Sequence, residues 1–124
     1  MIRLRIHNRY RYTRVGWWAW VLQRVTGIAL VLYLLVHIGV ISTAIAGEGT
    51  FDDTLAFLQT PVFVVLDLLL LAAVVYHAAN GVRIILLDLG IGIRAQATAW
   101  WTVMALTTGT VLAGATLTWP LIFP

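Results

Sequence analysis

The sequence predicts an all-α membrane protein with three transmembrane helices. Hydrophobic residues make up 61% of the 124 positions and charged residues only 10%, which is too apolar for a soluble domain of this size. Three apolar stretches each reach the roughly 20 residues that a helix needs to cross the hydrocarbon core. The arginines cluster beside these stretches, so the formal charge of +3 and the pI near 10 indicate membrane topology rather than nucleic-acid binding.

The composition also excludes several classes of chemistry. Cysteine is absent, which excludes disulfides, thiolate-bound iron–sulphur clusters and covalent haem attachment. The sequence has no glycine-rich phosphate loop, and it has no Ser/His/Asp set or paired carboxylates outside the apolar stretches. We therefore expect residues 1–124 to form a single membrane-anchor domain, with any substrate chemistry carried by other chains.

The first element is a basic, aromatic segment that we expect to be a cytoplasmic tail, residues 1–15. Anionic lipid headgroups attract such a segment by about 1 kcal/mol per arginine, and the same charge could dock an acidic soluble partner. Its basic residues are Arg3, Arg5, Arg9, Arg11 and Arg14.

The first transmembrane helix is predicted over about residues 17–42. Three tryptophans form an interfacial belt at its start, and residues 21–41 supply the apolar length. A signal peptide is the alternative, because Ala44-Ile45-Ala46 has the small-x-small form of a cleavage site. The apolar region is too long for a signal peptide and carries polar residues on one face, which favours a retained helix. That face, at helical spacing, holds Gln23, Thr26, Leu30, Tyr33 and His37.

The next segment, residues 47–59, has three acidic residues and no basic ones, so we expect it on the outer side. Thr50-x-x-Asp53 resembles a capping box. A short surface helix is predicted within residues 50–59, at about Phe51 to Leu58.

Two further spans complete the prediction. Pro61 suits the first turn of the second helix, which is predicted over about residues 61–88. The third helix is predicted over about residues 98–120, with Trp100, Trp101 and Trp119 marking its ends. The positive-inside rule then places the N-terminus in the cytoplasm and the C-terminus outside, in a multi-pass protein of the plasma (inner) membrane.

The second helix carries the main candidate site at His77. Ala73 and Gly81 lie about one turn on either side of it, so a flat group or a second backbone could approach the imidazole closely. An ionisable residue in a span usually faces the bundle interior and marks a relay or a cofactor. Residue types alone leave two alternatives open, haem ligation by His77 and a neutral, packed imidazole with Asn80-Gly81 as a packing notch.

Two motifs resemble one family. Tyr76-His77-x-x-x-Gly81-x-Arg83, followed by Asp88, is similar to the second transmembrane helix of the cytochrome b membrane-anchor subunit of succinate dehydrogenase, the large, C-type anchor of succinate:quinone oxidoreductase. The earlier run Leu22-Gln23-Arg24-Val25-Thr26-Gly27 resembles the family's first-helix signature, an arginine shortly before a Ser/Thr-Gly pair. The order of the two motifs, the length of the chain and the number of predicted helices also fit this family.

The resemblance implies a cofactor site. His77 matches one axial ligand of haem b, with the other supplied by a sister subunit, and Gly81 and Asp88 belong to the same motif. Arg24 and Arg83 match basic positions near the quinone site and the haem propionates. Trp20 stands where ubiquinone-reducing members have serine, and Gln23 where they have histidine, so menaquinone is favoured as the quinone.

His37 is a second candidate iron ligand. If Arg24 and Arg83 mark the same interface, His37 lies ~20 Å deep and His77 ~9 Å deep at 1.5 Å per residue. Two haems, each shared with a partner subunit, would fit this offset. With a single haem, His37 would instead be part of the packing face.

We therefore expect an anchor subunit that passes electrons from an iron–sulphur subunit to quinone, without catalysing dicarboxylate chemistry. Its expected partners are a second membrane-anchor subunit, an iron–sulphur subunit, a flavoprotein subunit and membrane lipid, with no nucleic acid. Two alternatives remain. A haem-free anchor would need neither histidine, whereas a small transporter would use Asp67, His37 and His77 as a proton path.

Overall fold

The computed structural model describes the backbone of residues 3–123 and the side chains of residues 14–123. Within these residues the chain is helical and contains no strand, which confirms the predicted class. Three segments are long and apolar enough to cross a membrane, at Arg14–Ala46, Pro61–Asp88 and Ile93–Ile122. The elements in order are α1 (Arg3–Ser42), the 3-10 turn η1 (Thr43–Ala46), α2 (Glu48–Leu58), α3 (Pro61–Asp88), the 3-10 turn η2 (Ile93–Ala95) and α4 (Gln96–Ile122).

The second helix has the predicted boundaries, and the other long helices extend beyond theirs. Helix α4 begins two residues before the expected start and continues to Ile122. Helix α1 begins at Arg3, so the described part of the expected tail is a continuation of the first span. The side chains of Arg3, Arg5, Arg9 and Arg11 lie outside the described residues.

The predicted capping box at Thr50 is wrong. Helix α2 starts at Glu48, and its N-cap is Gly47, which has φ 121° and ψ 159°. Glycine adopts a positive φ readily, so the chain turns at Gly47. The N-cap of α2 therefore lies three residues before Thr50, the predicted cap. The acidic Glu48 in the first turn then complements the helix dipole.

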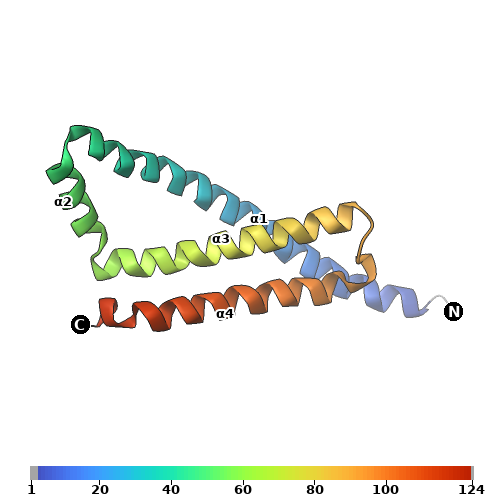
Figure 1. Cartoon of the computed structure of the whole chain (residues 1–124). Coiled ribbons are helices and arrows are strands. Elements are labelled where there is room, and N and C mark those ends of the chain that lie inside the picture. Colours follow the sequence, from blue (N-terminus) through green and yellow to red (C-terminus); the bar gives the residue numbers. More distant parts are fainter. Residues whose placement is uncertain (1–2, 124) are drawn as a thin grey trace.

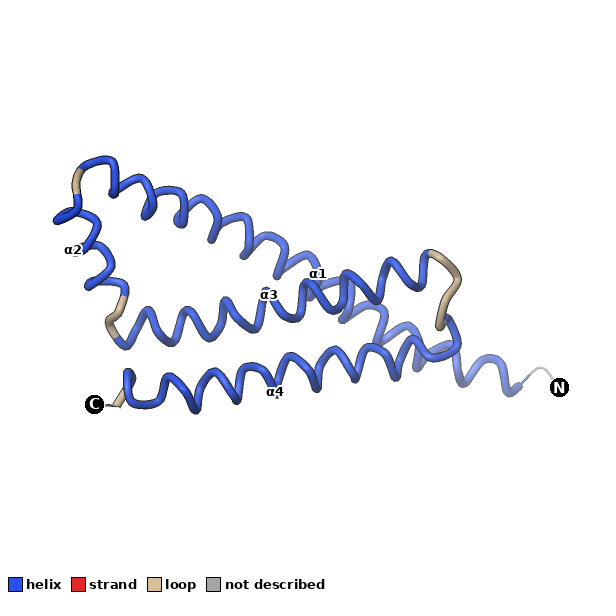
Figure 2. Tube along the Cα trace, viewed as in Figure 1, coloured by secondary structure: helices blue, strands red, loops and turns tan. Residues whose placement is uncertain are grey.

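The three long helices form a bundle that is closed at one end and open at the other. Helices α3 and α4 lie side by side along their length, whereas α1 crosses α3 and diverges from it toward α2 (Figure 1). Helix α2 bridges the separated ends of α1 and α3 (Figure 2). Helix α1 begins at one end of the bundle and α4 finishes at the other, as three successive spans require (Figure 1).

Charge is divided between the two ends of the bundle. Arg94 lies in η2, at the end of the bundle where α3 passes into α4 (Figure 1), and Asp88 is the last residue of α3 at the same end, while Arg14 lies on α1. Glu48, Asp52 and Asp53 lie on α2 at the other end. This separation is what the positive-inside rule uses to orient a membrane protein.

The buried core is small and lies mainly between α3 and α4, with Ala19 as its residue on α1. The accessible surface is 9642 Å², against about 6,600 Å² expected for a compact monomer of this mass. Large apolar side chains cover the C-terminal half of α1 and are exposed. Such a surface needs lipid or a partner chain to cover it. The buried residues are Ala19, Val64, Tyr76, Asn80, Arg83, Trp100, Val103 and Thr107.

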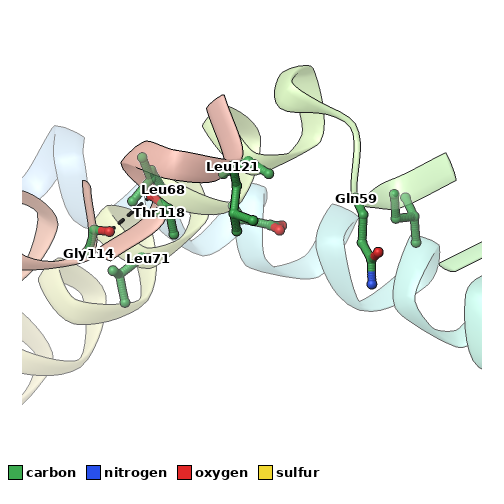
Figure 3. A pocket seen from close by; sticks show the side chains of 9 residues that line it. Gln59, Leu68, Leu71, Gly114, Thr118 and Leu121 are labelled. Atoms are coloured by element: carbon green, nitrogen blue, oxygen red, sulfur yellow. Dashed lines mark hydrogen bonds between the residues drawn. The ribbon is translucent and has the colours of Figure 1, made fainter. Parts of the chain in front are cut away.

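Toward the end of the bundle where α2 lies, the contact between α3 and α4 depends on Gly114. A Cβ at this position would lie 3.0 Å from Leu71 Cδ2 and 3.2 Å from Leu68 Cδ2. Figure 3 shows these two leucines beside Gly114, at the edge of a hollow of about 540 Å³, with the Thr118 hydroxyl donating to the Gly114 carbonyl. Small residues allow such close approach of helices in membranes.

We expect Gly114→Val to destabilise the bundle by about 1–3 kcal/mol, the usual cost of overpacking. The matched control is Gly109→Val on the same helix, because a Cβ at Gly109 meets no atom within 4 Å. Thermal unfolding of the full chain in detergent measures both. Equal midpoints for the two variants would show that Gly114 does not set the contact.

Candidate functional site

His77 lies at the crossing of α3 and α1, and both of its ring nitrogens contact α1. Nδ1 is 3.1 Å from Thr26 Oγ1, and Nε2 is 3.4 Å from Gln23 Nε2. A Cβ on Gly27 would lie 3.2 Å from His77 Cε1, so the absence of a side chain there permits the approach. The sequence left open whether a flat group or a second backbone approaches the imidazole. In the structure, the backbone of α1 lies close to it.

Gly81 makes the reciprocal contact on α3. A Cβ at Gly81 would lie 3.6 Å from Gln23 Nε2. Each helix therefore presents a glycine to a larger side chain of the other, Gly27 to His77 and Gly81 to Gln23. This pairing lets the two backbones approach closely at the crossing.

Asn80 links the site to three helices, and sequence reasoning treated it only as part of a packing notch. Its side chain is fully buried. Nδ2 donates to Gln23 Oε1 at 2.9 Å and to the Ala19 carbonyl at 3.4 Å, while Oδ1 accepts from Arg83 Nη1 at 3.4 Å. An amide within a span, three residues from both a histidine and an arginine, is the signal that could have identified it.

Arg83 is buried, with 7% of its surface exposed. Its Nε and Nη2 donate to the Gln96 carbonyl at 3.2 and 3.1 Å. Gln96 is the first residue of α4, so the guanidinium joins α3 to the start of α4. Most of its donors are thus committed inside the chain.

Four of the predicted site residues line one hollow of about 310 Å³. They are Trp20, Gln23, Arg24 and Arg83, with Gly16, Ala19 and Ile84 completing the lining. The Arg24 guanidinium carbon lies 4.1 Å from the centroid of the Trp20 ring, a cation–π contact on the exposed side of α1. A cation and a flat aromatic surface therefore stand together beside the hollow.

Tyr76 brings α4 into the same network. Its hydroxyl donates to the Ala19 carbonyl at 3.4 Å and accepts from Trp100 Nε1 at 3.3 Å. Trp100 lies near the start of α4, as predicted, and it is buried, while Trp101 is 62% exposed. The buried position gives the indole N–H of Trp100 a partner in the Tyr76 hydroxyl of α3.

His37 lies in a different part of the molecule. It is exposed, its Nδ1 is 3.4 Å from the Tyr33 hydroxyl, and the two rings stack at 5.4 Å. It lines a hollow of about 550 Å³ between the outer parts of α1, α2 and α3, together with Asp67. Thr26, which contacts His77, is about 16 Å from His37 along the helix axis at 1.5 Å per residue. The two histidines are therefore separate sites.

Asp88 is exposed at the last residue of α3. It lies about 16 Å along the axis from His77. The structure therefore does not bring Asp88 to the imidazole, unlike Gln23 and Gly81.

No group of three or more His, Cys, Asp or Glu side chains could hold a metal ion within the described part of the chain. His77 could supply one nitrogen ligand. Any metal bound there would take its other ligands from a macrocycle or from another chain.

The chain resembles known membrane proteins over most of its length. Residues 4–117 match the family described as "Succinate dehydrogenase/Fumarate reductase transmembrane subunit". The "Succinate dehydrogenase hydrophobic membrane anchor subunit" of Halobacterium salinarum is 39% identical over 107 residues, which cover 86% of this chain and 82% of that protein.

Two further relatives match over shorter stretches. The "Succinate dehydrogenase 2 membrane subunit SdhC" of Mycobacterium tuberculosis is 36% identical over 73 residues, 59% of this chain and 54% of that protein. The "Succinate dehydrogenase hydrophobic membrane anchor subunit" of Archaeoglobus fulgidus is 36% identical over 76 residues, 61% of this chain and 65% of that protein. The matched stretch thus spans less than two thirds of each of these two proteins.

We expect Asn80→Ala to destabilise the chain by about 1–3 kcal/mol or more, because its partners would be left buried and unpaired. Thr110→Ala is a matched control, since the Thr110 hydroxyl donates to the Leu106 carbonyl at 2.9 Å on an exposed face. Thermal unfolding in detergent compares the two. A midpoint for Asn80→Ala as high as that of the control would show that the network adds little stability.

Proposed function

We propose that this chain, which belongs to the succinate dehydrogenase/fumarate reductase transmembrane subunit family, holds haem b through His77 and contributes to a quinone site. The family match confirms the resemblance predicted from the sequence motifs. The chain is accordingly a multi-pass membrane-anchor subunit of succinate dehydrogenase/fumarate reductase. The cofactor and its electron transfer are the proposed part.

The observation that carries the proposal is the environment of the His77 imidazole. The ring is half-buried in a membrane span, and Gly27 on α1 lies close to it. Thr26 contacts Nδ1, as a second group usually does for a metal-bound histidine. To bind haem iron through Nε2, His77 would have to exchange its contact with the Gln23 amide for the iron, and the second protein ligand would come from the other membrane-anchor subunit. When bound, the haem would carry one electron at a time between iron–sulphur cluster and quinone.

Arg24 is the arginine best placed for an anionic group. Its guanidinium is exposed and stacks on Trp20, whereas the donors of Arg83 are directed to Gln96 and Asn80. Arginine suits both a haem propionate and a developing quinone oxyanion. The flat Trp20 ring beside Arg24 also supports menaquinone, whose fused rings can stack on an aromatic surface.

The remaining partners follow from the shape and charge of the bundle. A second membrane-anchor subunit and lipid would cover the exposed outer half of α1. The arginine-bearing end would face the cytoplasm and dock the iron–sulphur subunit, which carries the flavoprotein subunit. Dicarboxylate chemistry would then take place outside this chain.

A haem-free anchor is the second candidate function, and one observation favours it. Both ring nitrogens of His77 already have hydrogen-bonding partners within the chain. In that case His77 would serve only to hold α1 against α3.

We expect His77→Ala to remove one haem b per complex, because the iron would lose an axial ligand. The measurement is the haem content of the purified complex, expressed per flavin. His37→Ala is the matched control and should leave the His77-dependent haem in place. An unchanged haem content in His77→Ala would establish the packing role instead.

We expect His37→Ala to lose a second haem if the complex binds two. His37 lies about 16 Å along α1 from Thr26, the residue that contacts His77, and this is too far for a shared iron. Haem stoichiometry and the number of redox titration steps measure this. A single haem that survives in His37→Ala would make His37 part of a packing face with Tyr33.

A further inference from the structure

The turn between α3 and α4 carries three large apolar side chains, Leu89, Ile91 and Ile93, which we call the apolar tip. Their exposed fractions are 69%, 56% and 56%. A single exposed apolar residue is ordinary on a protein surface, whereas three in one short turn are typical of a surface that another molecule covers. The turn lies at the end of the bundle where α3 passes into α4 (Figure 1).

Hydrogen bonds fix the backbone of this turn. The Ile91 N–H donates to the Leu86 carbonyl at 2.8 Å, and the Gly90 N–H donates to the Leu87 carbonyl at 3.0 Å. These are the two bonds of a Schellman motif, which needs a left-handed residue after the helix, and Gly90 has φ 80°. In such a motif the apolar residue after the glycine often packs on its own helix, yet Ile91 stays largely exposed. The apolar tip is therefore presented by an ordered turn, which lowers the entropy cost of binding.

Arg83 fixes the place where the turn enters α4. Its Nε and Nη2 donate to the carbonyl of Gln96, the residue that follows η2. Its Nη1 donates to Asn80 Oδ1, and Asn80 is bonded to α1. The network at the helix crossing therefore also sets the position of the apolar tip relative to the bundle.

The exposed tryptophans of α4 place the apolar tip on the water side of the membrane. Trp101 and Trp119 are 62% and 59% exposed, and they lie about 27 Å apart along the axis, close to the roughly 30 Å of the hydrocarbon core. Such tryptophans mark the two headgroup layers. Helix α4 begins at Gln96, about 7.5 Å beyond Trp101, and a headgroup layer is only about 5–8 Å thick. The turn precedes Gln96, so lipid hydrocarbon does not cover the apolar tip.

We propose that the apolar tip is the centre of the surface that docks the iron–sulphur subunit, and that it enters an apolar pocket on that subunit. This inference rests on the proposed function, which brings the iron–sulphur subunit to this end of the bundle. Charged residues flank the tip, with Asp88 directly before it and Arg94 directly after it. An apolar centre with a charged rim is the usual anatomy of a protein interface. An acidic rim residue also disfavours anionic lipid headgroups as the cover, because like charges repel.

The first test is photo-crosslinking in the assembled complex within its native membrane. Ile91 is replaced by photoreactive p-benzoylphenylalanine, and the adducts are identified by mass spectrometry. We expect an adduct with the iron–sulphur subunit. The matched control is the same replacement at Ile45, which is 90% exposed in η1 at the α2 end of the bundle and should give no such adduct. Adducts of Ile91 only with lipid, or only with the second membrane-anchor subunit, would overturn the inference.

The second test measures how firmly the membrane retains the soluble subunits. Ile91→Glu places a charge at the centre of the tip, so binding should weaken by about tenfold or more. The readout is the flavin released from washed membranes, expressed per anchor chain found in the membrane. Ile91→Val keeps an apolar side chain and should behave as wild type, as should Ile45→Glu at the opposite end. Equal retention in Ile91→Glu and wild type would contradict the inference.

The outcomes separate this inference from the proposed function. If Ile91 gives no adduct with the iron–sulphur subunit while that subunit still co-purifies with the chain, the inference fails and the proposed docking stands. If the iron–sulphur subunit does not co-purify with the wild-type chain, the proposed docking fails and the inference fails with it. The haem content of the wild-type complex tests His77 separately from both.

Discussion

The arrangement of the three helices depends on the amide of Asn80, which is fully buried in a span with no water to satisfy it. In hydrocarbon an unpaired polar group costs several kcal/mol, so its partners must come from the chain itself. They come from α1 through Ala19 and Gln23 and from Arg83, which in turn binds the first residue of α4. The Asn80 side chain thereby bonds α1 to α3 at the crossing and reaches the start of α4 through Arg83.

This crossing also holds His77, the proposed haem ligand. Gln23 is held by Asn80 and contacts His77, so the network that stabilises the bundle also orients the imidazole. Beyond the crossing, α1 diverges from α3, and its apolar side chains are exposed (Figure 1). That divergence opens the separate hollow at His37 and leaves a surface for lipid and a partner subunit.

Much of the fold could be predicted, because apolar length and arginine placement are properties of single segments. The second span was predicted at its observed boundaries, and a second backbone was among the groups expected beside His77, where α1 lies. The roles of Asn80 and Trp100 could not be predicted, since helical periodicity places residues on a face but does not say which neighbour that face meets. The start of α2 was also missed, because Gly47 turns the chain through a backbone conformation that the capping pattern does not encode.

The central claim is that this crossing is built around a haem ligand rather than a structural histidine. The most direct measurement is the reduced-minus-oxidised visible spectrum of the purified complex. A low-spin b-type signal is expected, because two histidine ligands leave no open position on the iron. A spectrum without any haem signal, in a complex that retains its flavin and iron–sulphur clusters, would contradict the account and leave His77 as a packing residue between α1 and α3.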